Sequence, residues 1–319
     1  MSFSSEVKAE CCQIRFDRSL AIAECYGILL YCNTFRASEI RIITACPDFA
    51  DRLPRLFRKA FSLSFDQIPP ENAVGKRSFC IRDHDKILRI LDCFGADEKS
   101  LLSHHVNLGI LEEDGCAEAF VRGAFLAGGS VTDPEKRFHL ELATSHRSVC
   151  RELRSILLEF ELDPKEASRG AHALLYFKKA DQISDFLARI GAQVSSLHII
   201  TAKVEKEMRN TVTRQINCDS ANADKTVSAA MRQNEAIRKV LKRDGMDALP
   251  ETLRDAALLR LANPEASLSD LALLSNPPVT KSCLSHRLNK IISLAGEDGD
   301  FPLPDGRGKQ AVIGEEEPS

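Results

Sequence analysis

A run of basic and hydrogen-bonding residues near the carboxyl end, from Thr280 to Ile292, has the composition of a surface that contacts nucleic acid. Leu284, Leu288 and Ile291 follow one another at helical spacing and predict the buried side of a helix. No acidic residue lies from Val279 to Ser293, so the other faces present cations and hydrogen-bonding groups. Such a helix can donate to base edges in the major groove and neutralise phosphates. We expect base-edge contacts from Lys281, Ser282, Ser285 and Asn289, phosphate contacts from Arg287 and Lys290, and a DNA contact from His286.

Two shorter helices must hold this basic helix in place. Pro250 suits the first turn of one of them. Ser267 and Asp270 have the capping-box spacing, in which the hydroxyl accepts a backbone N–H and the carboxylate reaches back to a second one. The turn from Ser275 to Pro278 then leads to the basic helix. This order predicts a helix-turn-helix domain over residues 244–294, and the alternative is a three-helix bundle that binds protein or no partner.

A basic segment precedes this domain, because residues 201–243 hold 10 Lys and Arg against 5 Asp and Glu. Helical patterns run from Val204 to Arg214 and from Thr226 to Arg243, with a polar turn or linker from Asn217 to Asp224 between them. Before them, Ser195 to Lys203 has the pattern of a strand. This helical basic linker could bring Arg209, Asn210 and Arg214 to phosphates, or it could be a solvated connector.

The totals describe an ordinary globular chain of 319 residues, with 44% hydrophobic residues, 28% charged residues and a net charge of −3. No apolar run is long enough to span a membrane, and the amino terminus lacks a signal-peptide pattern. The 11 cysteines are scattered, without a C-x-x-C pair, which indicates reduced thiols. We expect a cytoplasmic protein with no membrane partner, no cofactor and no metal. The acidic tail over residues 295–319 is expected to be disordered.

Two apolar segments that contain glycine recur 96 residues apart in the amino-terminal part of the chain. The segment from Phe120 to Ser130 matches the one from Glu24 to Thr34, and this match places Gly27 on Gly123. Glycine lets two helix backbones approach closely. We therefore expect Gly27 and Gly123 to lie at a helix interface, and the alternative is ordinary core packing.

The elements around these two helices are repeated as well. Gly95 and Gly191, also 96 residues apart, are expected to end the two copies. The repeat predicts an α+β fold in which halves of about 15–96 and 111–192 pack about a pseudo-twofold axis within residues 1–200, followed by an all-α domain. The first copy is predicted as helix 19–31, strand 38–46, helix 54–62 with Pro54 in its first turn, strand 76–82 and helix 85–93. The second is predicted as helix 117–127, strand 137–144, helix 148–162, strand 171–178 and helix 181–190.

This arrangement resembles the LAGLIDADG homing endonucleases over about residues 16–192. In that family the paired helices each end in a carboxylate that binds a divalent metal beside the scissile phosphate. The matching positions here are Cys32 and Gly128, and neither side chain can hold Mg²⁺, which requires oxygen ligands. Asp133 lies in a turn and has no counterpart in the first copy. We expect the fold without catalytic residues.

Three stretches together resemble the WhiA family of bacterial regulators. They are the degenerate glycine helices, the polar run from Glu207 to Asn222, and the segment from Asn276 to Leu288. The resemblance implies a transcriptional regulator of cell division, chromosome segregation or sporulation that associates with the nucleoid and binds promoter DNA through its carboxyl-terminal domain. The resemblance also allows other transcription or division proteins as partners.

Two other functions remain open on the sequence alone. A metal-dependent homing-type endonuclease would need acids at unusual positions, and Asp83 and Asp133 are the candidates. Alternatively, the duplicated domain could be a platform for a protein or a ligand.

Overall fold

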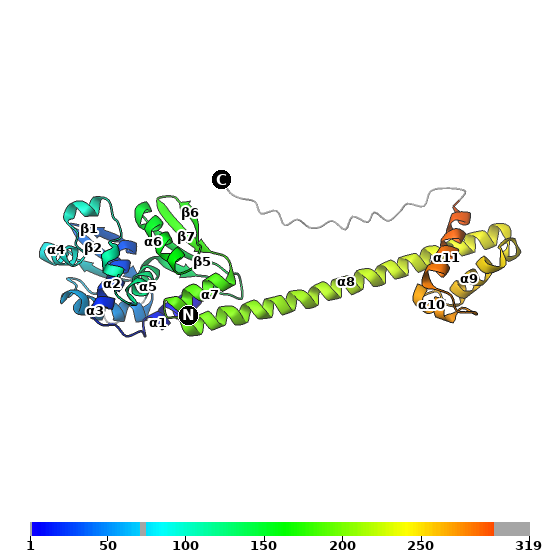
Figure 1. Cartoon of the computed structure of the whole chain (residues 1–319), viewed down its shortest axis with the longest axis horizontal. Helices are drawn as coiled ribbons and strands as arrows, with labels where there is room; N and C mark the ends of the chain where they lie inside the picture. Colours follow the sequence, from blue (N-terminus) through cyan, green and yellow to red (C-terminus); the bar gives the residue numbers. More distant parts are fainter. Residues whose placement is uncertain (1, 71–74, 297–319) are drawn as a thin grey trace. The chain divides into compact units, whose positions relative to one another are not determined.

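The computed structural model describes residues 2–70 and 75–296, which form two compact units that divide between Arg209 and Asn210 (Figure 1). The first unit mixes helices and strands, and the second is helical, in agreement with the predicted α+β class. The predicted acidic tail lies outside the described residues from position 297 onward. Within the described ranges, no helix is long and apolar enough to cross a membrane.

The first half of the amino-terminal unit carries a small antiparallel sheet in the order β1-β2-β3. Ile40 and Ile42 point into the core from the central strand, where they face Ile81 and Phe79 of the next strand. The elements of this half are α1 (Phe3–Cys11), α2 (Arg18–Tyr31), β1 (Thr34–Arg36), β2 (Glu39–Thr44), α3 (Pro47–Phe61), β3 (Arg77–Ile81) and α4 (His84–Cys93).

The second half repeats this plan with a sheet in the order β4-β5-β7-β6. Short 3-10 helices over Glu98–Leu102 and Leu108–Leu111 connect the two halves. The elements are α5 (Cys116–Gly128), β4 (Gly129–Val131), β5 (Leu140–Thr144), α6 (Arg147–Glu159), β6 (Lys165–Arg169), β7 (His172–Phe177) and α7 (Ala180–Arg189).

Strand pairing defines which residues of the two halves correspond. Ile42 pairs with Phe79 in the first sheet, and Leu142 pairs with Leu175 in the second. Phe79 and Leu175 keep the 96-residue offset, but Ile42 and Leu142 are 100 residues apart. The turn before β5 is therefore four residues longer than its counterpart, while the offset at both ends of the repeat is the predicted one. The buried Thr44 confirms this register, because its hydroxyl accepts the amide of residue 46 as that of Thr144 accepts the amide of residue 146.

The predicted start of α3 needs correction. The third helix begins at Pro47, seven residues before the predicted start at Pro54. Pro47 takes the first-turn position that proline favours, so Pro54 lies inside the helix. At the place that corresponds to β6, the described residues of the first sheet form a single bridge between Gln67 and Cys80.

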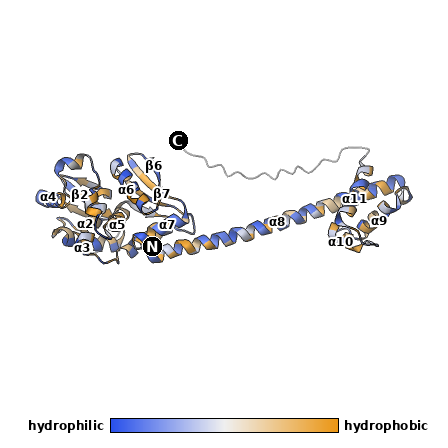
Figure 2. Cartoon of the chain, viewed as in Figure 1, coloured by the Kyte–Doolittle hydropathy of each residue, from blue (hydrophilic) through white to orange (hydrophobic). Residues whose placement is uncertain are grey.

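A long helix, α8 (Gln193–Asp244), replaces the predicted strand over Ser195–Lys203 and the predicted turn over Asn217–Asp224. Its first turn is capped from α1, since the Glu10 carboxylate accepts the amides of Val194 and Ser195 at 2.6 and 3.0 Å. Along its length α8 alternates hydrophilic and hydrophobic residues (Figure 2). Residues 193–209 of α8 belong to the first unit and residues 210–244 to the second.

The second unit packs the end of α8 against three further helices. Gly245, with a φ of 79°, ends α8, and Pro250 is the residue before the next helix rather than in its first turn. The core of this unit includes Val240, Ala257 and Leu271. The remaining elements are a 3-10 turn (Met246–Ala248), α9 (Glu251–Ala262), α10 (Leu268–Leu274) and α11 (Lys281–Ala295).

Candidate nucleic-acid interface

The predicted basic helix is α11, and its apolar side is buried as expected. Leu284, Leu288 and Ile291 are each at most 1% exposed. Thr280 caps the helix, because its hydroxyl accepts the amide of Cys283 at 3.2 Å. Burial of three aliphatic side chains at helical spacing therefore fixes which face α11 turns outward.

The turn between α10 and α11 fixes the relation of these two helices. The Ser275 hydroxyl accepts the Val279 amide at 3.0 Å, and that amide also lies 3.2 Å from the Ala272 carbonyl. At the start of α10, Ser267 accepts the Asp270 amide at 3.2 Å. The Asp270 carboxylate then accepts the Ser267 hydroxyl at 2.7 Å, instead of the backbone N–H predicted for a capping box. Side-chain hydrogen bonds therefore fix both ends of α10, and those of Ser275 also fix the turn that leads to α11.

Arg260 is a buried residue of this domain that the sequence did not single out. It is 1% exposed and donates to the Ala266 carbonyl at 2.6 Å, which holds the loop between α9 and α10. Burial lowers the pKa of its guanidinium. The only sequence signal was a position three and four residues after the buried Ala257 and Ala256, where the apolar side of α9 would continue.

The predicted DNA-contacting side chains lie on the solvent side of α11. At 100° per residue, Ser282, His286 and Asn289 lie opposite the buried leucines. Ser285 and Arg287 are half-buried at the margins of this outward face. None of the seven side chains forms a hydrogen bond or an ion pair with a residue in the described part of the chain. The exposed members are Lys281, Ser282, His286, Asn289 and Lys290.

Arg287 lies at the margin of the outward face and also beside a cavity with apolar lining. It lines a cavity of about 500 Å³ between α9 and the turn before α11, together with Leu258 and Leu274. Both leucines are about half exposed. The aliphatic part of Arg287 therefore packs along apolar surface, while its charged group can still reach solvent.

The three residues predicted to contact phosphates lie on α8, in both units. Arg209 belongs to the first unit, whereas Asn210 and Arg214 belong to the second. Residues 210–228 are exposed along α8, so these side chains do not pack against the helix-turn-helix core.

In the first unit, α2 and α5 cross at the predicted glycines and form what we call the helix junction. A Cβ atom on Gly27 would overlap the Phe120 carbonyl oxygen, and one on Gly123 would overlap the Glu24 carbonyl oxygen. Residues 24 and 120 are themselves 96 residues apart, so the contact is symmetric between the halves. This reciprocal contact is what the predicted twofold relation requires.

The ends of these helices carry no metal-binding group. Cys32 follows α2, and its thiol donates toward the Leu29 carbonyl at 3.2 Å. Burial raises the pKa of the Cys32 thiol to about 12, so it stays protonated. Gly128 ends α5, and a Cβ there would lie 2.5 Å from the Ala143 carbonyl oxygen. A carboxylate therefore has no room at Gly128.

The other candidate acids have structural contacts. Asp83 caps α4 by accepting the amides of Asp85 and Lys86, and Asp133 accepts the amide of Glu135 at 2.9 Å in a turn. Across residues 2–70 and 75–296, no group of three or more His, Cys, Asp or Glu side chains is placed to hold a metal ion.

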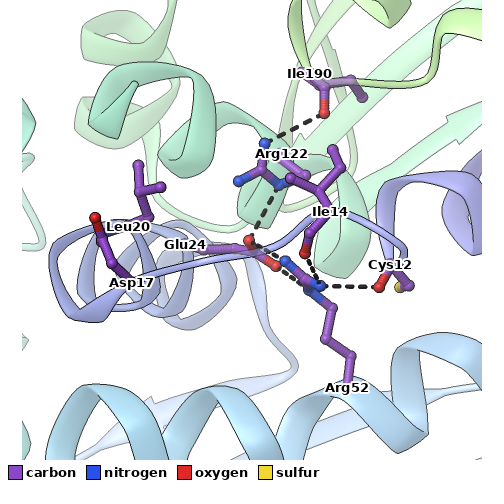
Figure 3. A network of polar contacts seen from close by, with 8 residues as sticks. All are labelled: Cys12, Ile14, Asp17, Leu20, Glu24, Arg52, Arg122 and Ile190. Carbon is purple, nitrogen blue, oxygen red and sulfur yellow. Dashed lines mark hydrogen bonds and ion pairs between the residues drawn. The ribbon is translucent and has the colours of Figure 1, made fainter. Parts of the chain in front are cut away.

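A buried charge cluster crosses the helix junction, and the sequence did not reveal it (Figure 3). Glu24 is fully buried and accepts Arg52 Nε and Nη2 at 2.7 and 2.8 Å. Arg122, on α5 of the other half, donates to the same carboxylate at 3.1 Å. Burial alone would lower the pKa of Arg52, but hydrogen bonds and the charge of Glu24 raise it above its usual value. The cluster therefore ties the two halves together by charge.

Comparison with known proteins gives matches over most of the chain. The WhiA LAGLIDADG-like domain model matches residues 117–209, and the WhiA C-terminal HTH domain model matches residues 212–295. A Clostridium botulinum protein named "Probable cell division protein WhiA" is 34% identical over 310 residues, which are 93% of this chain and 98% of the relative. A Clostridium novyi protein of the same name is 35% identical over 311 residues, with the same coverage.

A solved structure agrees with these matches. The crystal structure of full-length DUF199/WhiA from Thermatoga maritima aligns with a TM-score of 0.57 and 26% identity, over 94% of this chain and 100% of that one. The predicted LAGLIDADG-like domain followed by a helix-turn-helix domain is confirmed.

Proposed function

The chain belongs to the WhiA family, and on that basis we propose that it is a sequence-specific DNA-binding regulator of transcription that acts in cell division. We also propose a role in chromosome segregation and sporulation. In these roles the protein would bind promoters on the nucleoid, in the cytoplasm. Other transcription or division proteins are partners that such a role would involve.

The observation that carries this proposal is the outward face of α11. It combines Lys281, Arg287 and Lys290 with hydrogen-bonding groups, and no acidic residue lies from Val279 to Ser293. A helix whose other side is buried and whose exposed side is basic suits insertion into a major groove. We assign base-edge contacts to Lys281, Ser282, Ser285 and Asn289, and phosphate contacts to Arg287 and Lys290. His286 is assigned a DNA contact by its outward position.

The test of this proposal is to map bound sites across the genome and to measure binding of the mapped motif in vitro. We expect the motif duplex to bind more tightly than a scrambled duplex, and both affinities to fall with added salt as counterions are released. Equal affinity for the two duplexes would contradict sequence specificity.

We further propose that the LAGLIDADG-like unit is not a nuclease. Cys32 and Gly128 cannot supply the carboxylates that the paired helices of a homing endonuclease would need, and Gly128 has no space for one. Incubation of supercoiled and linear DNA with Mg²⁺ or Mn²⁺ should give no cleavage. Cleavage that disappears in an Asp83→Ala/Asp133→Ala variant would instead support the endonuclease alternative.

One observation favours an interaction platform as the role of the first unit. On its sheets, Glu39 lies 3.0 Å from Arg82, and Glu141 lies 3.2 Å from Arg169. These pairs neutralise cations that a DNA-clamping sheet would present to phosphates. Duplex affinity of the isolated fragment 1–199 would count against the platform, and its absence would support it.

A further inference from the structure

The helical side of the first unit carries a basic recess, which we define by five residues. Its volume is about 540 Å³ and it opens to solvent. The segment between α1 and α2 supplies Arg15 and Phe16, and α3 supplies three exposed cations. The lining residues are Arg15, Phe16, Arg55, Arg58 and Lys59.

The cations of the basic recess have no acidic partner among the described residues. None of its four cationic side chains forms an ion pair or a hydrogen bond with a residue in the ranges that the structure describes. The acid one turn before Arg55 on α3 is Asp51, which lies 3.7 Å from Arg77. Like charges three and four residues apart on one helix face repel each other. An anion in the recess would remove this repulsion.

The other half of the unit shows that the module does not need these charges. The register of the two sheets makes α3 and α6 correspond at an offset of 100 residues. The α6 residues that correspond to Arg55, Arg58 and Lys59 are Ser155, Leu158 and Glu159. The same helix therefore packs with one neutral polar, one apolar and one acidic residue at these places, so core packing does not explain the basic set.

Contacts with the buried Arg52 hold the segment that presents Arg15 in position. Arg52 donates to the carbonyls of Cys12 and Ile14 at 2.9 and 2.7 Å, which lie on either side of residue 13 in the segment leading to Arg15. Its guanidinium lies 4.7 Å from the centre of the Phe16 ring. Because Glu24 fixes Arg52, the segment that presents Arg15 is anchored to the buried charge cluster. A prepositioned site loses less conformational entropy when a ligand binds.

We propose that the basic recess binds a compact polyphosphate anion of the kind carried by nucleoside di- and triphosphates. Three of the four cations are arginines, and each planar guanidinium group can donate two parallel hydrogen bonds to one phosphate group. The cations come from two segments and line an open recess, whereas an extended nucleic-acid backbone would match a linear row. The residues of this site belong to the first unit, whereas α11 belongs to the second, so the proposal uses none of the residues assigned to DNA contacts.

The test uses isothermal titration calorimetry on the full chain, with inorganic tripolyphosphate, ATP and GTP as probes. The variant Arg55→Ser/Arg58→Leu/Lys59→Glu gives α3 the residues that α6 already carries at the same places, so it should fold. We expect saturable binding of at least tripolyphosphate by the wild type, and binding weaker by roughly tenfold or more in the variant. Thermal unfolding of the variant confirms that it is folded.

The control variant Arg18→Ser/Arg89→Leu/Lys99→Glu makes the same change in net charge at exposed positions of the first unit outside the recess. It should keep the wild-type affinity for the probes. The proposal is overturned if no probe saturates the wild type, or if both variants lose affinity equally. It is also overturned if a short DNA duplex displaces tripolyphosphate from a protein that carries Lys281→Ala/Arg287→Ala, because the recess would then be a site for the DNA backbone.

Discussion

Gly27 and Gly123 occupy equivalent positions in the two halves, and each faces a backbone carbonyl of the other half's helix. Gly27 contacts the carbonyl of Phe120, and Gly123 contacts that of Glu24. The helix junction is therefore a backbone-to-backbone contact with no space for a methyl group at its centre.

Substitution of either glycine by alanine should destabilise the first unit. The new Cβ atom meets rigid backbone rather than a movable side chain, and such overpacking costs about 1–3 kcal/mol or more. Differential scanning calorimetry should show a lower midpoint for Gly27→Ala and for Gly123→Ala. Gly109→Ala is the control, since its Cβ would lie 3.3 Å from a side-chain atom of Asn107 and would not overlap backbone. Equal midpoints for all three variants would contradict the backbone contact.

The buried charge cluster should be sensitive to the loss of its single acid. Glu24→Gln leaves two buried arginines without a counter-charge, and breaking a buried pair in this way costs about 3–5 kcal/mol. The two arginines should differ as well. Arg52→Met should lower the free energy of unfolding more than Arg122→Met does. Arg52 also donates hydrogen bonds to the carbonyls of Cys12 and Ile14, whereas Arg122 has one longer contact, 3.4 Å to the Ile190 carbonyl.

These differences in the free energy of unfolding of the first unit can be measured by urea unfolding of the full chain, monitored by hydrogen exchange. Glu39→Gln serves as the matched control, because Glu39 is a partly exposed acid that also contacts two arginines. A Glu24→Gln variant as stable as Glu39→Gln would show that the cluster does not hold the halves together.

His104 should make the first unit less stable in acid. Its ring is buried between Phe35, 5.3 Å away, and His146, 4.0 Å away. Burial and the neighbouring His146 lower the pKa of His104 to about 4, below the value of about 6.5 in the unfolded chain. The folded state thus resists protonation, so stability is complete above pH 6.5 and falls as the pH drops toward 4.

The expected loss due to His104 is on the order of 2–3 kcal/mol. Midpoints of thermal unfolding between pH 7 and pH 5 should fall less steeply for His104→Phe than for the wild type. His172→Phe changes an exposed histidine on β7 and should keep the wild-type slope. Identical slopes for all three proteins would exclude His104 as the source.

The two kinds of contact assigned to α11 predict different effects on DNA binding. Arg287→Ala/Lys290→Ala should weaken binding to all sequences alike and lower the salt slope by about 2, because two phosphate contacts are lost. Asn289→Ala should keep the salt slope but reduce discrimination at one base pair by about 1–3 kcal/mol. Competition with single-base variants of the mapped motif separates the two cases, and identical behaviour of both variants would refute the assignment.

The sequence predicted the parts of this fold that follow from periodicity. The apolar stripe of α11 and the glycine pair of the helix junction were both visible as spacings. In the structure the stripe is buried, and each glycine lies against backbone of the opposite helix. Three strands were missed for physical reasons. β1 and β4 have three residues each, too few to show alternation, and β6 is exposed on every residue, so it has no apolar face.

The buried charge cluster could not be predicted because its members lie far apart in sequence. Glu24 stood out only as one acid in an apolar helix, and the predicted helix start at Pro54 left Arg52 outside any element. The basic recess could not be predicted for the same reason. Arg55, Arg58 and Lys59 share a helix face by spacing, but only the fold brings Arg15 to them. The residues assigned to DNA contacts remain predictions.

Binding of duplex DNA by α11 is tested most directly by fluorescence anisotropy of a Lys281→Ala/Arg287→Ala variant. We expect the affinity for the mapped motif to fall by roughly tenfold to a hundredfold and the salt slope to become shallower. The control Arg18→Ala/Arg89→Ala removes two exposed charges from the first unit and should bind as the wild type does. Unchanged affinity and an unchanged salt slope in the α11 variant would contradict the claim.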